Sequence, residues 1–338
     1  MTKISLLKVA GENNEKCTND PSLRLMKHLT LKIKNNCGNQ NVLHYYSWAP
    51  DEAIGWVHII HGMSEHALRY FEVAQFLANS GYIVTADDHR GHGKTGVSSN
   101  SLAHLADREG WSLLLQDQMA LLKTINKSNG LKAFILGHSM GAAISLALCQ
   151  KYASEFRHLA AGIILSGSWY ASSTSYRPAS AIARFERARL GPRNPSNLLH
   201  YLSFGNFNRS FKPYETEADW LSRDKCKVLD YVADPLCGFP LTTQSWVDFL
   251  DGLIQIFKKT SLRKIDPKFP FYLISGDEDP VGGKGNKVKD LFCKLSETGI
   301  EDIKMTLYSG SRHEVFNETN RREVCFDIQR WMDRILNR

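Results

Sequence analysis

The chain has 338 residues, of which 43% are hydrophobic and 23% are charged. These values are ordinary for a globular protein with a sizeable core, and they argue against a disordered chain. The formal net charge of +7 favours anionic surfaces only weakly. Because no dense basic cluster with interleaved aromatic residues occurs, we expect no nucleic-acid partner.

The cysteines indicate a reducing compartment. They are odd in number, widely spaced and without a C-x-x-C pair: Cys17, Cys37, Cys149, Cys226, Cys237, Cys293 and Cys325. Such thiols are expected to be free, and without paired ligands we expect no metal site. The N-terminal stretch is a poor signal peptide, and no apolar run of about 18 residues occurs. We therefore expect a cytoplasmic protein without a membrane span.

In chain order, residues 1–27 are polar and irregular, and we interpret them as an N-terminal extension. Two short strands are predicted next, over 29–36 and 42–49, around the turn-like NCGNQN. From there strands and helices alternate: strand 56–60, helix 70–81, strand and glycine-rich loop 82–93, helix 111–127, strand 132–136, helix 140–152 and strand 160–168. Short apolar strands, each followed by a helix, predict a parallel sheet with helices on both faces.

This alternation is interrupted between residues 168 and 261. The stretch is rich in prolines and aromatic turns and contains less regular helical patterns, over 179–191 and 242–260. The alternation then resumes with strand 269–276, helix 286–299, strand 303–310 and helix 322–336. The simplest architecture is an α/β core over 28–167 and 262–338, with a mainly helical cap over 168–261.

Between a predicted strand and a predicted helix lies the sequence GHSMG, from Gly137 to Gly141. A strand-to-helix turn this sharp forces Ser139 into strained backbone angles and exposes its hydroxyl. Larger side chains two residues before and after the serine would clash, so Gly137 and Gly141 are expected to shape the turn. Ser139 is therefore the candidate nucleophile.

A serine nucleophile needs a base and a group that orients the base. In this architecture the acid and then the histidine should follow at the ends of later strands. The sequence SGSRHE offers His313, the only histidine after residue 200. The earlier sequence GDEDP offers three neighbouring acids, Asp277, Glu278 and Asp279. Asp279 is favoured as the acid, with Asp277 expected to stabilise the loop.

The reaction also needs donors for the oxyanion. The backbone N–H of Met140, directly after the candidate nucleophile and at a helix N-terminus, is one candidate. The N–H of Met63, in the sequence HGMSEH after the strand 56–60, is the second. The backbone donates in both cases, so the two methionine side chains are not required.

Four segments together resemble the α/β-hydrolases of the monoacylglycerol lipase and lysophospholipase group, also described as serine-aminopeptidase-like. They are HGMSEHALRYFEVAQFLANSGY, DDHRGHGKT, GHSMG, and SGDEDP with RHEVFNE, in the family's order between Val57 and Arg338. The resemblance implies Ser139 as nucleophile, Asp279 as acid and His313 as base, with Met63 and Met140 in the oxyanion hole. It implies an acyl-enzyme mechanism without a cofactor.

The expected substrate is a carboxylic ester of a single-chain lipid, a monoacylglycerol or a lysophospholipid. Aromatic residues that could wall an acyl tunnel, or simply form the core of the cap, are Trp169, Tyr170, Phe204, Phe207, Trp220, Trp246 and Phe249. A peptidase or a small-ester carboxylesterase is the alternative, and acidic cap residues aimed at a free amine would favour the peptidase: Glu186, Glu215, Glu217 and Asp219. A non-catalytic binding protein is disfavoured because no triad member is missing. A transient association with membrane surfaces is compatible with a lipid substrate, and the sequence predicts no oligomeric state.

Overall fold

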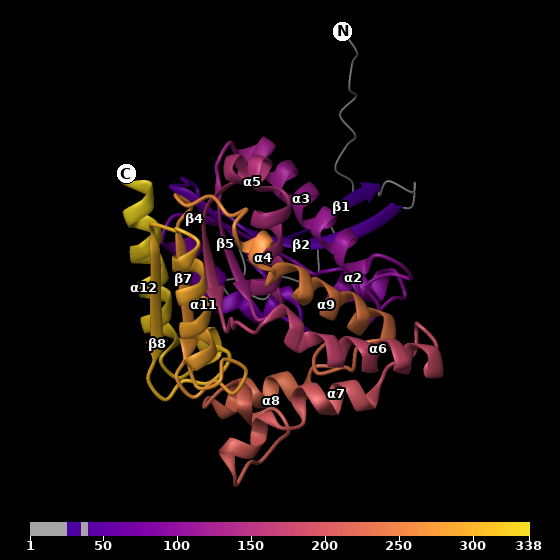
Figure 1. Cartoon of the computed structure of the whole chain (residues 1–338). Coiled ribbons are helices and arrows are strands. Elements are labelled where there is room, and N and C mark those ends of the chain that lie inside the picture. Colours follow the sequence, from indigo (N-terminus) through magenta and orange to yellow (C-terminus); the bar gives the residue numbers. More distant parts are fainter. Residues whose placement is uncertain (1–25, 35–39) are drawn as a thin grey trace.

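The computed structural model describes residues 26–34 and 40–338 and contains one eight-stranded sheet (Figure 1). In chain order the strands are β1 (Met26–Lys34), β2 (Gln40–Trp48), β3 (Gly55–Ile60), β4 (Tyr82–Asp87), β5 (Ala133–His138), β6 (Ala160–Ser166), β7 (Phe271–Gly276) and β8 (Ile303–Tyr308). Their order across the sheet is β1-β2-β4-β3-β5-β6-β7-β8. The β1–β2 and β2–β4 pairs are antiparallel, and all pairs from β4 to β8 are parallel. This is the mostly parallel sheet that the alternating pattern predicts.

One boundary of the sequence prediction needs correction. β1 begins at Met26, so the last two residues of the expected extension belong to the sheet. Met26 and Lys27 pair with residues of β2 at the edge of the sheet. The side chain of Met26 is partly buried and packs against the core. The remainder of the expected extension, residues 1–25, and the expected turn over 35–39 lie outside the described residues.

Helices connect the strands and form the layers on either side of them. They are α1 (Phe71–Asn79), α2 (Gly93–Ser98), α3 (Gly110–Asn129), α4 (Met140–Lys151), α5 (Ala153–Leu159), α6 (Arg177–Leu190), α7 (Asn197–Phe204), α8 (Lys225–Ala233), α9 (Thr243–Ile256), α10 (Lys259–Leu262), α11 (Asn286–Glu297) and α12 (Arg321–Leu336). The helix predicted over 140–152 ends at Lys151, because Tyr152 leaves helical backbone angles before α5 begins.

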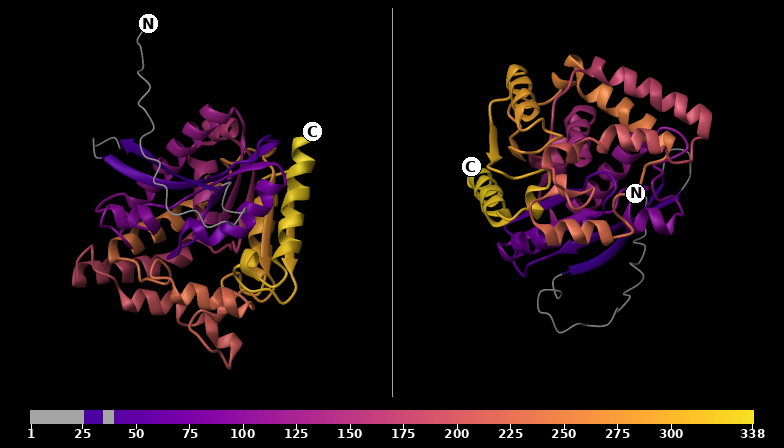
Figure 2. Two further views of the ribbon diagram at one scale, coloured as in Figure 1. Left: turned by 180° about the vertical axis from the view of Figure 1, so that it is seen from behind. Right: turned by 90° about the horizontal axis from the view of Figure 1, so that it is seen from below.

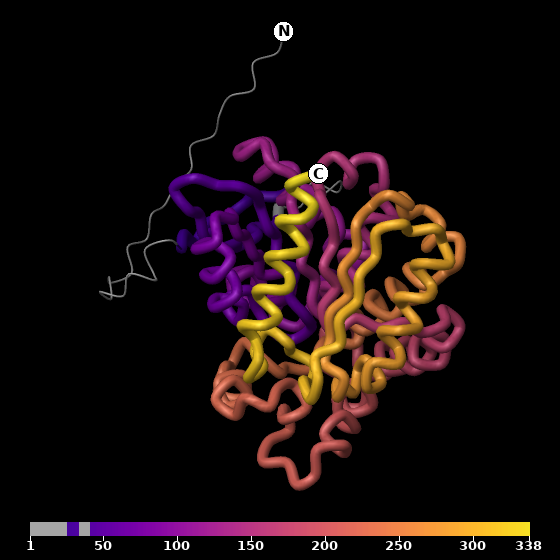
Figure 3. Tube along the Cα trace, turned by 90° about the vertical axis from the view of Figure 1, so that its left-hand side faces the viewer, coloured from indigo at the N-terminus to yellow at the C-terminus, as the bar shows by residue number. Residues whose placement is uncertain are grey.

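The core consists of two apolar layers, one on each face of the sheet. On β3, Trp56 and Ile60 face one layer, while Val57 and Ile59 face the other. This alternation is what a strand with both faces buried requires. Helices α3, α4, α5 and α11 contribute to the first layer. Helices α1 and α12 cover the opposite face, and α12 is the yellow helix along the sheet in Figures 2 and 3.

Between β6 and β7 the chain leaves the sheet and forms α6 to α10. Helices α6, α7 and α8 lie at one end of the molecule, the lower edge in Figure 1. Helix α9 returns and packs against both α6 and the core helices α3 and α4. The backbone N–H groups of His313 and Glu314, in the loop after β8, donate to the carbonyls of Trp220 and Leu221 at 3.4 and 2.8 Å. This segment between the strands therefore lies directly over the loop that carries His313.

Candidate active site

The turn at Ser139 is as sharp as its sequence predicts. β5 ends at His138 and α4 begins at Met140, so a single residue reverses the chain direction. Ser139 has φ 51° and ψ −114°, in the positive-φ region that residues with a side chain rarely adopt. Its N–H donates to the Ser166 carbonyl at 2.9 Å, which fixes the strained turn to β6. Ser139 is half-buried, whereas both of its neighbours, His138 and Met140, are buried.

Two glycines allow this turn. A Cβ atom at Gly141 would lie 1.9 Å from the Ile60 carbonyl oxygen at the end of β3. A Cβ atom at Gly137 would lie 2.4 Å from the Gly141 carbonyl oxygen. The Ile60 carbonyl belongs to β3 and the Gly141 carbonyl to the first turn of α4, so any side chain at these positions would open the turn.

The loops after β7 and β8 bring Asp279 and His313 together. Asp279 Oδ2 lies 3.0 Å from His313 Nδ1, and both residues are buried. Asp279 also accepts hydrogen bonds from the Ser275 hydroxyl at 3.0 Å and the Val281 N–H at 2.8 Å. These contacts hold the carboxylate in one orientation, and its bond to Nδ1 leaves Nε2 of the imidazole for a reaction partner.

The other two acids of the GDEDP loop point elsewhere. Asp277 accepts a hydrogen bond from the Gly310 N–H at 2.6 Å, which joins the loops after β7 and β8. Glu278 forms an ion pair with Lys284 at 2.8 Å. Within the part of the chain that the structure describes, no carboxylate other than Asp279 hydrogen-bonds to His313.

Electrostatics prepare His313 to accept a proton. Burial lowers the pKa of His313, but the charge of Asp279 and its hydrogen bond outweigh burial, so the pKa lies above its ordinary value. Burial raises the pKa of Asp279, but the charge and hydrogen bond of His313 lower it below its usual range. The carboxylate therefore stays ionised and stabilises an imidazolium.

The ring of His138, the last residue of β5, lies beside the imidazole of His313. The two rings lie 4.7 Å apart between centroids, which places His313 beside the turn at Ser139. Burial, together with the charge of His313, lowers the pKa of His138 to about 3. Its Nδ1 lies 3.1 Å from the Ser166 hydroxyl. His138 is thus a neutral, hydrogen-bonded wall of the site rather than a second base.

The two expected oxyanion donors lie at the ends of β3 and β5. Met140 is the first residue of α4, so its N–H has no intrahelical partner. Met63 lies in the loop over 61–66, which we call the oxyanion loop. Among the described residues, neither N–H donates to a protein acceptor. The N–H of Gly62, in contrast, donates to Glu65 Oε1 at 2.5 Å. Of these neighbouring N–H groups, those of Met63 and Met140 therefore have no acceptor within the described part of the chain.

The sequence analysis missed a buried ion network beside the site. Arg69 bonds to Glu65 Oε2 at 2.6 Å and to both carboxylate oxygens of Glu314, and these side chains are at least nine-tenths buried. The guanidinium also lies 4.6 Å from the ring centroid of Tyr231 on α8. The sequence carries no helical signal for this pairing, because Glu65 lies in the loop before the 3₁₀ helix Ala67–Tyr70 that carries Arg69.

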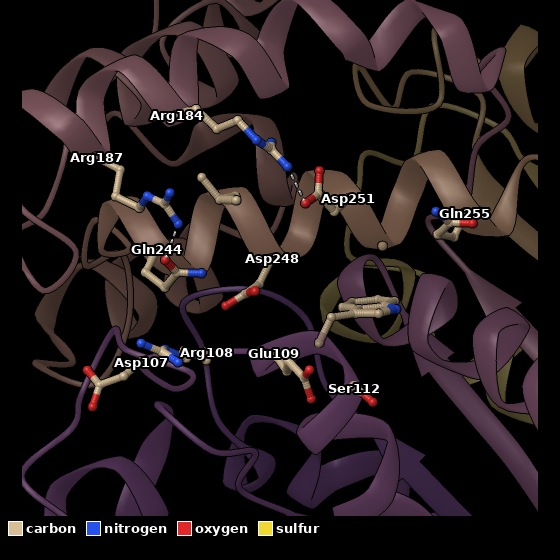
Figure 4. A pocket seen from close by; sticks show the side chains of 13 residues that line it. Asp107, Arg108, Glu109, Ser112, Arg184, Arg187, Gln244, Asp248, Asp251 and Gln255 are labelled. Carbon is tan, nitrogen blue, oxygen red and sulfur yellow. Dashed lines mark hydrogen bonds and ion pairs between the residues drawn. The ribbon is translucent and has the colours of Figure 1, made fainter.

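Two hollows lie near the cap. The larger, a groove of about 450 Å³ lined by charged residues together with Trp111 and Val247, runs between the loop before α3 and helices α6 and α9 (Figure 4). Arg184 pairs there with Asp251, and Arg187 with Gln244, as the dashed lines show. None of Ser139, Asp279 and His313 lines this groove. The smaller is a crevice of about 10 Å³ beside the turn, lined by Ala142, Ala143, Leu146, Ser168, Trp169 and Phe257.

Most of the aromatic residues singled out in the cap pack against one another. Phe204 contacts Phe207, Trp220 and Trp246 with ring centroids 6.0 to 6.3 Å apart. Trp220 additionally lies 5.1 Å from His313, centroid to centroid. Cap core is thus the main role of these rings, while Trp220 and Trp169 also border the site. In the described residues, no helix has the length and apolarity that crossing a bilayer requires.

The chain is similar to known proteins both in sequence and in fold. The family model described as serine aminopeptidase, S33, matches residues 51–320. Monoacylglycerol lipase of Mycolicibacterium smegmatis is 30% identical over 85% of this chain and 91% of its own length. Human monoglyceride lipase is 27% identical over 82% of this chain and 81% of its own. A thermostable carboxyl esterase from Bacillus coagulans, solved with glycerol, has a TM-score of 0.82 at 26% identity, covering 91% of this chain and 99% of that one.

Proposed function

The chain belongs to the serine aminopeptidase, S33, family and has the α/β-hydrolase fold, and on that premise we propose that it cleaves carboxylic esters of single-chain lipids. The observation that carries this proposal is the buried Asp279–His313 pair beside the strained, half-buried Ser139. Monoacylglycerols and lysophospholipids are the substrate class, in keeping with the lipases and the esterase to which the chain is similar.

The reaction proceeds through an acyl-enzyme. Ser139 attacks the ester carbonyl while His313 Nε2 takes its proton, and Asp279 stabilises the imidazolium that forms. The N–H groups of Met63 and Met140 bind the tetrahedral oxyanion, each donor contributing about 3 kcal/mol. His313 then protonates the leaving alcohol and activates the water that releases the fatty acid. These groups supply all the chemistry, so the reaction needs no metal or organic cofactor.

The acyl chain is proposed to enter the crevice beside Ser139. Ala142 and Ala143 follow the serine on the first turn of α4, and Trp169 and Phe257 close the opposite wall. A crevice of about 10 Å³ holds roughly one water molecule, so a long acyl chain must displace the aromatic walls. This position favours an apolar acyl group over a charged one.

The contacts of three of the four acidic cap residues, all but Glu217, argue against an amine-binding peptidase site. Glu186 accepts from the Ser196 hydroxyl at 2.7 Å and pairs with Arg189. Glu215 pairs with Lys225, and Asp219 accepts from the backbone N–H of Thr216 at 3.0 Å. Because these carboxylates bind groups of the cap itself, they support an ester substrate rather than a free amine.

A transient association with membrane surfaces also belongs to this proposal. Large apolar side chains are exposed at helical spacing on α6, α7 and α8: Ile182, Phe185, Leu198, Tyr201, Leu202, Leu229 and Val232. Spacings of three and four residues place each set on one face of its helix. Exposed apolar patches of this kind mark lipid or protein contacts.

The five described cysteines are free, which supports a cytoplasmic location.

A fluorophosphonate probe tests the proposal. Purified protein should be labelled once, the Ser139→Ala variant should not be labelled, and Ser128→Ala on α3 should be labelled like the wild type. A panel of monoacylglycerols, lysophospholipids, p-nitrophenyl esters and aminoacyl amides then tests the substrate class. Turnover of the amides alone would overturn the lipid-ester proposal, and equal labelling of Ser139→Ala would overturn the nucleophile.

A further inference from the structure

Three side chains that the reaction does not use meet where the cap touches the oxyanion loop. They are His66, at the end of that loop, and Asp234 and Cys237, in the chain that follows α8. Their ligand atoms all lie within 4.8 Å of one another. His66 Nε2 is 2.8 Å from Asp234 Oδ2. In the described part of the chain, no hydrogen bond involves the Cys237 sulfur, and the thiol is free.

An imidazole nitrogen, a carboxylate oxygen and a thiol form a donor set suited to zinc and related transition metals. Bond lengths of about 2.0 to 2.3 Å in a tetrahedral site place the ligand atoms about 3.4 to 3.6 Å apart. The observed separations, from 2.8 Å to at most 4.8 Å, bracket this range. Side-chain shifts of about 1 Å would therefore complete a three-ligand site with water at the fourth position.

The backbone already holds the two segments side by side. Cys237 N–H donates to the Asp234 carbonyl at 3.0 Å, which makes the turn that carries both cap ligands. Directly after it, Gly238 N–H donates to the Ser64 carbonyl at 2.9 Å, and the Ser64 hydroxyl donates to the Phe239 carbonyl at 2.7 Å. Binding a metal here requires little ordering of the chain, because the ligands are close together in its absence.

The local charge also favours a cation. The groups that act electrostatically on Cys237 are three carboxylates (Glu65, Asp234 and Glu314) and one guanidinium, that of Arg69. Their formal charges sum to −2, the charge that a divalent ion would neutralise. The Asp234 side chain remains 30% exposed, so an ion can reach the site from solvent.

We propose that His66, Asp234 and Cys237 bind one divalent transition-metal ion, with zinc as the preferred metal. The ion joins the cap at Asp234 and Cys237 to the oxyanion loop at His66. It thereby fixes the cap on the loop that carries Met63, without taking part in ester cleavage. The site is independent of the proposed reaction, so its test can fail while the hydrolase proposal stands.

The experiment uses the full chain, stripped with a chelator and titrated with zinc by calorimetry. We expect about one ion per chain at this site and a higher unfolding temperature with zinc, because an ion that binds only the folded state stabilises it. Cys237→Ser and Asp234→Asn should each weaken zinc binding by about 100-fold or more, since loss of outer-shell partners alone costs 10- to 100-fold. Cys226→Ser, an exposed cysteine on the same cap segment, is the matched control and should bind zinc like the wild type.

Cobalt provides a second readout that does not depend on the variants. The wild-type protein with Co²⁺ should show sulfur-to-cobalt charge-transfer absorption, and this absorption should persist in Cys226→Ser. Thermal unfolding of the metal-free proteins, followed by circular dichroism, reports whether the Cys237→Ser variant is folded. Unchanged zinc affinity in folded Cys237→Ser, or no charge-transfer band in the wild type, would overturn the proposed site.

Discussion

Replacing Asp279 with asparagine tests how the carboxylate controls the tautomer of His313. The Val281 N–H, 2.8 Å from Oδ1, is a backbone donor that cannot rotate away. An asparagine must therefore place its amide oxygen at Oδ1 and its NH₂ group at Oδ2, 3.0 Å from His313 Nδ1. Two donors cannot face each other, so Nδ1 becomes the acceptor and the ring proton moves to Nε2.

That tautomer cannot take the proton of Ser139, because Nε2 already carries one. A carboxylate-to-amide change that imposes the wrong tautomer lowers kcat by roughly 10⁴, which corresponds to about 5.4 kcal/mol of transition-state stabilisation. The fold should survive, because asparagine has nearly the same shape and the Ser275 hydroxyl can rotate to accept from its NH₂ group.

The assay is kcat for a short-chain p-nitrophenyl ester, with thermal unfolding measured in parallel. Asp277→Asn is the matched control, since this side chain accepts from the Gly310 N–H and does not contact His313. The amide oxygen of an asparagine at position 277 can still accept the hydrogen bond from the Gly310 N–H. Even complete loss of this bond would cost about 1 kcal/mol, which corresponds to a fall in kcat of no more than about fivefold. An Asp279→Asn variant that kept a tenth of wild-type kcat, or a larger loss in Asp277→Asn, would refute this reasoning.

Three further predictions concern the pH dependence of kcat/KM, the stability of the fold and the length of the acyl chain in the substrate. Since the neutral imidazole is the base and the pKa of His313 lies above its ordinary 6.5, kcat/KM should fall with decreasing pH around a midpoint above 6.5, and a midpoint below 6.5 would contradict this. Arg69→Met leaves two buried carboxylates without their partner and should cost roughly 3 to 5 kcal/mol in denaturant unfolding. Arg321→Met also removes two ion pairs, with Glu72 and Asp224, but these are partly exposed and should together cost about 1 kcal/mol. Ala143→Phe should fill the crevice and lower kcat/KM for long-chain monoacylglycerols about tenfold relative to acetate esters; an equal effect on both would place the acyl chain elsewhere.

Hydrophobic periodicity and local turn chemistry were enough to predict the parallel sheet and the sharp turn at Ser139. Both depend on residues within a few positions of each other, such as the glycines at 137 and 141, whose need is set by the turn itself. The chain order of an acid and a histidine after later strands also follows from topology, because parallel strands bring their carboxyl ends to one edge of the sheet. These features can therefore be predicted from short stretches of the sequence.

Contacts between residues that are far apart in the sequence have no such local pattern in the sequence. The sequence favoured Asp279 among three adjacent acids, but only the folded loops show that Asp279 contacts His313 while Asp277 accepts from the Gly310 N–H. The widely spaced His66, Asp234 and Cys237 carry no metal-binding motif, so the sequence led us to expect no metal, and their proximity arises from the cap lying on the oxyanion loop. Local patterns determine elements and turns, whereas the packing of the cap on the core decides which side chains meet, because that packing joins segments about 170 residues apart.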